Sequence, residues 1–160
     1  MVAHDLYAET NPAFGTYAIV AFCREYQLAS TRNPSIALLY LALPIAMSRD
    51  VERSFSETNA KTGLLAWLNR YPELRLNLGA RLDASLDVVT ASLRLGLMSN
   101  ALELLEKGAI GLGSKPPIKA PITRLPTEPK KAIKRAERLG RWMGKAGSPG
   151  SVFSAFGVIL

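Results

Sequence analysis

The sequence predicts a mainly α-helical fold: a compact helical domain with one small β-hairpin. Residues 11–27 and 34–55 are apolar on almost every side, which is typical of helices buried in a core. Residues 115–145 hold ten lysines and arginines against two glutamates, so all of the net charge of +7 lies in this segment. The chain has 160 residues, 48% of them hydrophobic, and can therefore bury a sizeable core.

We divide the chain, as a single domain over residues 1–160, into five segments. They are an N-terminal extension (1–10), a helical core (11–108), a hairpin or loop (109–126), a basic helix (127–146) and an apolar C-terminal tail (147–160).

Compartment and membrane contact follow from the first half of the chain. Residues 1–10 lack the basic region and the apolar core of a secretory signal, so we expect a cytoplasmic protein. Neither apolar run reaches the roughly 20 residues that a membrane-spanning helix needs. The single cysteine, Cys23, excludes an internal disulfide and predicts a buried thiol.

Prolines and glycines divide the helical core. Pro34 follows a polar turn and suits the first position of the second helix, and Pro44 inside that helix predicts a kink, a break or a restart. A third helix over residues 60–70 should stop before Pro72. Leucines at intervals of four then predict a segment weakened by Gly79, and a further helix over residues 85–97.

The helical pattern ends at residues 98–114, where turn and strand signals replace it. Asn100 is a plausible cap for a short turn that ends at Gly108, and residues 109–112 suit a strand. Glycines and prolines then predict a loose hairpin over residues 109–122. The order of two helices and a hairpin is also that of a winged helix-turn-helix.

The basic helix has the clearest pattern. Thr127 is a predicted cap, Pro129 lies in the first turn, and alanines, leucine and methionine form the inward stripe. The opposite face carries Lys130, Lys131, Lys134, Arg135, Arg138, Arg141 and Lys145. Such a row neutralises the phosphates of DNA or meets an acidic partner, and it is equally typical of a solvated face.

The tail and the end of the basic helix are the other candidates for contact. Phe153 and Phe156 are costly to expose, so the tail either folds back onto the core or inserts into another subunit. Trp142 stands at the end of the basic row, where it would stack on a partner. We therefore take Trp142, Phe153 and Phe156 as candidate partner contacts.

Residues suited to catalysis are few. The only histidine, His4, has no cysteine or carboxylate cluster near it in the sequence, and the phosphate-binding loop and the nucleophile elbow are both missing. The sequence therefore predicts a protein with no catalytic residues, no metal site and no cofactor.

Three stretches resemble a known family. Asn11-Pro12-Ala13 leads into an apolar helix that ends at Tyr26-Gln27, the next run ends Leu43-Pro44-Ile45, and residues 90–97 read TASLRLGL. This pattern, over roughly residues 10–115, resembles the middle components of bacterial three-component ABC systems. Among these are the small subunits of Lamassu-type, SMC-like anti-phage defence complexes.

The resemblance implies a non-catalytic accessory subunit. Its expected partners are an SMC-like ABC ATPase, an effector nuclease and double-stranded DNA. The alternative, from the residues alone, is a free-standing winged-helix transcriptional regulator, which would bind DNA with a steep salt dependence. A peripheral membrane protein is the weakest reading, because small residues dominate the inward stripe of the basic helix.

Overall fold

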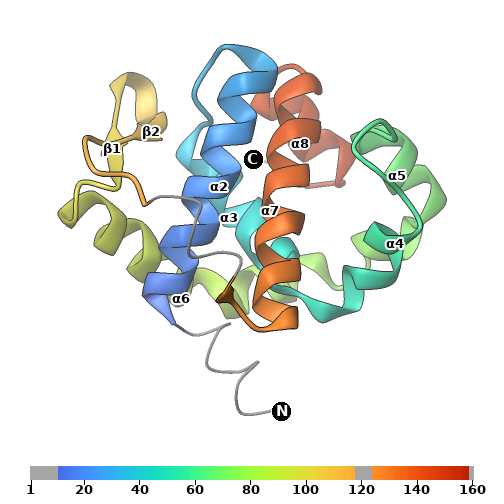
Figure 1. The fold of residues 1–160 in the computed structure, drawn as a ribbon. Helices are drawn as coiled ribbons and strands as arrows, with labels where there is room; N and C mark the ends of the chain where they lie inside the picture. The colour runs from blue at the N-terminus through green and yellow to red at the C-terminus, as the bar shows by residue number, and fades with distance from the viewer. Residues whose placement is uncertain (1–10, 118–123, 159–160) are drawn as a thin grey trace.

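A computed structural model of the chain describes residues 11–117 and 124–158. Within them the fold is mainly α, with one two-stranded antiparallel hairpin, which confirms the predicted fold class (Figure 1). The helices are α2 (Pro12–Ser30), α3 (Ile36–Met47), α4 (Glu52–Ser56), α5 (Leu64–Arg70), α6 (Leu78–Met98), α7 (Thr127–Lys145) and α8 (Pro149–Ala155). Short 3-10 turns lie at Arg49–Val51, Pro72–Arg75 and Glu106–Gly108, and the strands are β1 (Leu102–Leu104) and β2 (Ile110–Leu112).

The centre of the molecule is the pair α2 and α7, which run parallel and pack against each other more extensively than any other two elements (Figure 1). Gly140 and Gly144 make this close approach possible. A Cβ at Gly144 would lie 2.8 Å from the carbonyl oxygen of Tyr26, and one at Gly140 would overlap the backbone of Phe22. The two helices therefore touch backbone to backbone at these points.

In the second apolar run, 34–55, residues 36–47 form α3, and Pro44 does not break this helix. The last part of the run forms the 3-10 turn and α4. Ser35 caps the helix by accepting a hydrogen bond from the amide of Ala37 at 3.2 Å. Pro34 thus lies before the helix and not at its first position. Pro44 stands only three residues before the end at Met47, so the backbone bond that it removes belongs to the last turn.

Four buried aromatic rings join α4, α5, α7 and α8 on the other side of α7. Phe55 stacks on Trp142 with 5.6 Å between ring centroids, and Trp67 lies 5.2 Å from each of them. Phe156, just after α8, lies 6.2 Å from Trp67. The end of the chain therefore folds back onto the core as far as Val158, the last described residue.

The leucine-rich segment after Pro72 forms one long helix where the sequence suggested two segments. α6 runs unbroken for 21 residues, because Gly79 lies exposed in its first turn and does not interrupt it. Leu78, Val89 and Leu93 are buried, and the helix packs against α2 and α3.

The hairpin lies earlier in the chain than predicted. Its strands pair Leu102 with Leu112 and Leu104 with Ile110, so it spans residues 102–112. The strand predicted over residues 109–112 is present as β2, but its partner β1 precedes it in the chain, where the sequence suggested a turn. Asn100 and Lys107 adopt positive φ values of 63° and 60°, which allows the tight turns on both sides of β1. The predicted hairpin residues 118–122 lie outside the described residues, as does the N-terminal extension with His4.

Candidate macromolecule-binding surfaces

α7 begins at Thr127, after the extended Pro126, so Thr127 is the first helical residue and not the cap. The helix is covered on two sides, by α2 on one and by α3, α4 and α5 on the other. For this reason the seven basic residues predicted to share an outward face have different surroundings. The structure separates them into four that bind groups within the fold and three that face outward.

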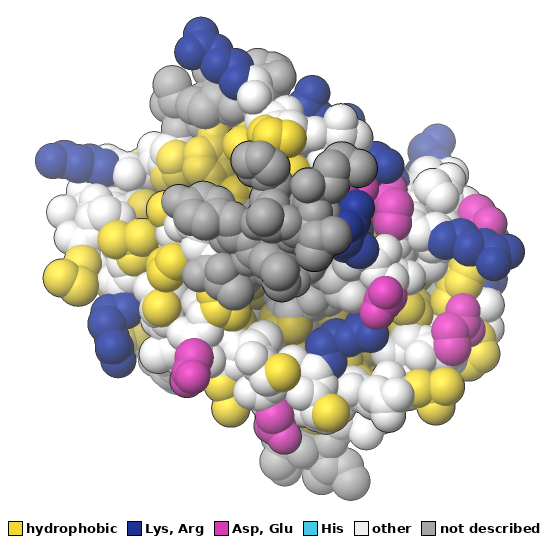
Figure 2. Space-filling model, turned by 90° about the horizontal axis from the view of Figure 1, so that it is seen from below, with side chains coloured by type: hydrophobic (Ala, Val, Ile, Leu, Met, Phe, Trp, Pro, Cys, Tyr) yellow, Lys and Arg dark blue, Asp and Glu magenta, His cyan; other side chains and the backbone are white. Residues whose placement is uncertain are grey.

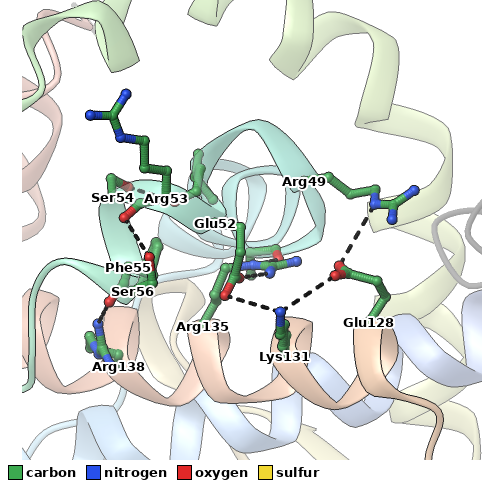
Figure 3. Close-up of polar contacts among 12 residues, drawn as sticks. Arg49, Glu52, Arg53, Ser54, Phe55, Ser56, Glu128, Lys131, Arg135 and Arg138 are labelled. Carbon is green, nitrogen blue, oxygen red and sulfur yellow. Dashed lines mark hydrogen bonds and ion pairs between the residues drawn. The ribbon is translucent and has the colours of Figure 1, made fainter.

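Arg135 is buried, with 3% of its surface exposed. Its Nε donates to the carbonyl oxygen of Ala46 at the end of α3 at 2.7 Å, and its Nη1 forms an ion pair with Glu52 of α4 (Figure 3). A charged side chain is tolerated in such a place when it is paired and hydrogen-bonded. Arg135 therefore ties α7 to α3 and α4 and is not available to a partner.

Arg138 holds the end of α4. Its Nη1 donates to the carbonyl oxygen of Phe55 at 2.7 Å (Figure 3). It also donates to the carbonyl oxygen of Thr58 at 3.2 Å. The guanidinium also lies over the rings of Phe55, at 5.3 Å, and Trp142, at 5.7 Å, where cation–π attraction adds to the hydrogen bonds. Burial lowers the pKa of Arg138 from its ordinary value.

Lys131 and Arg141 are paired with glutamates. The Nζ of Lys131 lies 3.8 Å from Glu52 and 3.9 Å from Glu128, and Arg141 binds the largely buried Glu25 of α2 at 3.1 Å. Figure 3 shows Lys131 between Glu52 and Glu128. The charges of Lys131 and Arg141 are therefore largely neutralised within the fold.

Three lysines remain, and we call Lys130, Lys134 and Lys145 the lysine row. Their spacing of four and eleven residues puts them on one side of α7. Lys134 and Lys145 are exposed and Lys130 is partly so. Over the described ranges, no carboxylate forms an ion pair with any of the three. That they bind DNA or an acidic partner stays a prediction.

The three aromatic candidates face inward. Trp142, Phe153 and Phe156 are each at most 5% exposed, and the indole N–H of Trp142 donates to the carbonyl oxygen of Ala60 at 3.0 Å. Of the two alternatives for the tail, the structure has the one in which it folds back. These rings build the core, and of the three only Trp142 also lines one of the two hollows described next.

Two hollows were not foreseen from the sequence. The larger, of about 780 Å³, lies between the start of α2, the end of α3 and α6, and contains Arg49, Asp50, Arg81 and Asp87 among apolar residues. The smaller, of about 320 Å³, lies where α7 ends beside α5 and α8. Figure 2 shows the end of the molecule at which α2 begins, where apolar, basic and acidic side chains are interspersed. Neither hollow has a signal in the sequence, because each combines residues from distant segments.

The described residues offer little for chemistry. They contain no group of histidine, cysteine and carboxylate side chains that would hold a metal ion. Burial raises the pKa of the Cys23 thiol to about 12, so Cys23 is not a nucleophile at neutral pH. No helix in the described part of the chain is long and apolar enough to cross a membrane.

Fold and surface together define a small helical protein with a row of outward-facing lysines and two hollows on its surface. A family model agrees with this class. Residues 2–160 match the family described as ABC-three component (ABC-3C) system Middle Component 3, and the chain belongs to that family. It is therefore an accessory component of a multi-component system, as the resemblance implied. Neither a curated protein nor a solved structure matched the chain.

Proposed function

We propose that this chain is the non-catalytic subunit that links an SMC-like ABC ATPase to an effector nuclease in an anti-phage complex. Its family membership, as a middle component, carries the proposal. The tightly packed α2 and α7, with charges paired inside the fold, suit a rigid body that holds two partners.

The lysine row gives this subunit a share in DNA contact but not a full binding site. Each lysine that neutralises a phosphate adds close to one unit to the slope of log K against log salt, so three lysines give a slope of about 3. Tight DNA-binding proteins use roughly 6–10 such contacts. The row therefore fits one part of a composite surface, completed by a partner subunit.

The same count weighs against the free-standing regulator. Of the seven basic residues predicted for the DNA face, Arg135 and Arg138 bind backbone and carboxylate groups of the core, and Lys131 and Arg141 are paired with glutamates. Recruiting these four to DNA would uncover buried carbonyl and carboxylate oxygens, which costs free energy.

The test is co-expression of the full chain with the products of its neighbouring genes, followed by native mass spectrometry. We expect a stable assembly that contains an SMC-type ATPase. DNA binding by the assembly and by the chain alone is then compared over a range of salt concentrations. Lys130→Glu with Lys134→Glu should lower the slope of the assembly by about 2, and the exposed Lys115→Glu serves as the matched control.

Two results would contradict the proposal. A chain that purifies as a lone monomer beside all of its neighbours would remove the linking role. A lone chain that binds one duplex sequence tightly, with a slope well above 3, would favour the regulator.

A further inference from the structure

The smaller hollow lies at the end of α7, and we call it the end pocket. Its floor is apolar, with Trp142 at the bottom, and Leu65 stands at its rim with 62% of its surface exposed. It is lined by residues 60–66, up to the start of α5, by the end of α7 and by α8.

The frame of the end pocket is fixed before any partner arrives. Asn59 accepts a hydrogen bond from the amide of Lys61 at 2.8 Å, and the hydroxyl of Thr62 accepts one from the amide of Asn59 at 3.0 Å. The indole N–H of Trp142 holds the carbonyl oxygen of Ala60. A preformed site loses less entropy on binding than one that must first be ordered.

The charge of the end pocket has one sign. Lys61 and Lys145 are its charged residues, both are exposed, and the lining contains no aspartate or glutamate. In the described parts of the chain neither lysine forms an ion pair. The larger hollow differs, because arginines and aspartates both line it and Arg81 pairs with Asp50 at 3.4 Å. Of the two hollows, the end pocket is therefore the one whose charge favours an acidic partner.

The volume limits what enters. About 320 Å³ is at the lower end of the range for ligand pockets, so it suits one or two side chains and not a helix of 10–12 Å diameter.

We propose that the end pocket receives a short segment of a partner subunit in which carboxylates stand next to an aliphatic or aromatic side chain. The apolar side chain occupies the floor, and the carboxylates meet Lys61 and Lys145. This inference rests on the proposed linking function and names the chemistry of one of its contacts. The lysine row and the end pocket share Lys145, so the two surfaces are continuous. With the partner segment bound, Lys145 serves the end pocket, and Lys130 and Lys134 remain for DNA.

The experiment uses the co-expressed assembly of the full chain. A photo-crosslinking residue, p-benzoylphenylalanine, replaces Leu65 at the rim, and in a second variant it replaces the exposed Leu104 of the hairpin as a control. We expect the first to crosslink a partner peptide that contains aspartate or glutamate beside an apolar residue. The affinity of the assembly is measured in parallel for Lys61→Glu with Lys145→Glu and for Lys115→Glu.

Reversal of both pocket charges should weaken the assembly about tenfold at low salt and less at high salt, because exposed charges are screened. Lys115→Glu should leave the affinity unchanged within about twofold. An assembly that forms with full affinity in the double variant, and gives no acidic crosslink from position 65, overturns the end pocket but leaves the linking function intact. If the wild-type chain forms no assembly, the linking function itself fails, and the end pocket fails with it.

Discussion

Replacement of Arg135 by methionine tests whether the basic residues of α7 hold the fold together. Methionine keeps most of the aliphatic volume but leaves the carbonyl oxygen of Ala46 without its donor, in a place where Arg135 is only 3% exposed. A buried acceptor without a partner costs about 1–3 kcal/mol. Glu52 also loses its closest cation. Because Glu52 keeps Lys131 at 3.8 Å and its side chain is 29% exposed, the loss of this ion pair adds only about 1 kcal/mol to the cost.

The expected loss is thus about 2–4 kcal/mol of unfolding free energy, a large part of the roughly 5–15 kcal/mol typical of a domain. Urea unfolding followed by tryptophan fluorescence measures it directly, since both tryptophans are buried. With a slope of about 2 kcal/mol per molar urea, the midpoint should fall by about 1–2 M.

The neighbouring Lys134→Met is the matched control, because it removes an exposed charge from the same helix and should stay within about 0.5 kcal/mol of the wild type. Adding Glu52→Met to Arg135→Met should restore part of the stability, because it removes the partly buried carboxylate that lost its closest cation. If Arg135→Met and Lys134→Met had equal midpoints, the assignment of Arg135 to the core would be refuted.

Three further predictions concern stability. Gly140→Ala should destabilise the fold by about 2 kcal/mol or more, because its Cβ would overlap the backbone of α2. Gly79→Ala, with open space around it, should stabilise the fold by about 0.5–1 kcal/mol. Thermal melts of the two variants measure the difference. The Cys23 pKa of about 12 means that the folded state keeps its proton above pH 9 while the unfolded thiol loses it. Relative to Cys23→Ala, the wild type should therefore lose stability as pH rises from about 9 towards 12, and a flat difference would contradict this. Arg138→Lys should cost about 1–2 kcal/mol in urea unfolding, because an ammonium does not reproduce the planar contact with Phe55 and its carbonyl oxygen.

The sequence predicts the apolar helices well because their side chains are apolar on every face. α2 begins and ends within a few residues of the run that predicted it, and Cys23 is buried as expected. α3 begins near the start of the run 34–55 but ends at Met47, where the charge-free part of that run ends. For α7, the inward stripe was right. The fold class could be reached from these elements alone.

The hairpin and the basic residues show where local pattern fails. Residues 101–105 have the leucine and glutamate content of a helix, yet they form β1 because β2 pairs with it and Leu102 packs against Gly96 of α6. The sequence pattern of α7 suggests one buried face, packed on a single neighbouring layer, and Arg135 lies on the opposite, polar face. A second layer, α4 and α5, covers that side, and only the tertiary structure reveals it.

The backbone contact between α2 and α7 has a mechanical meaning. Two helices that meet through side chains can slide when those side chains change rotamer, but at Gly140 and Gly144 there is no side chain to yield. The start of α2 lines the larger hollow, and the end of α7 lines the end pocket. The two hollows are therefore joined by a pair of 19-residue helices, each about 28 Å long, whose closest contact no rotamer change can loosen.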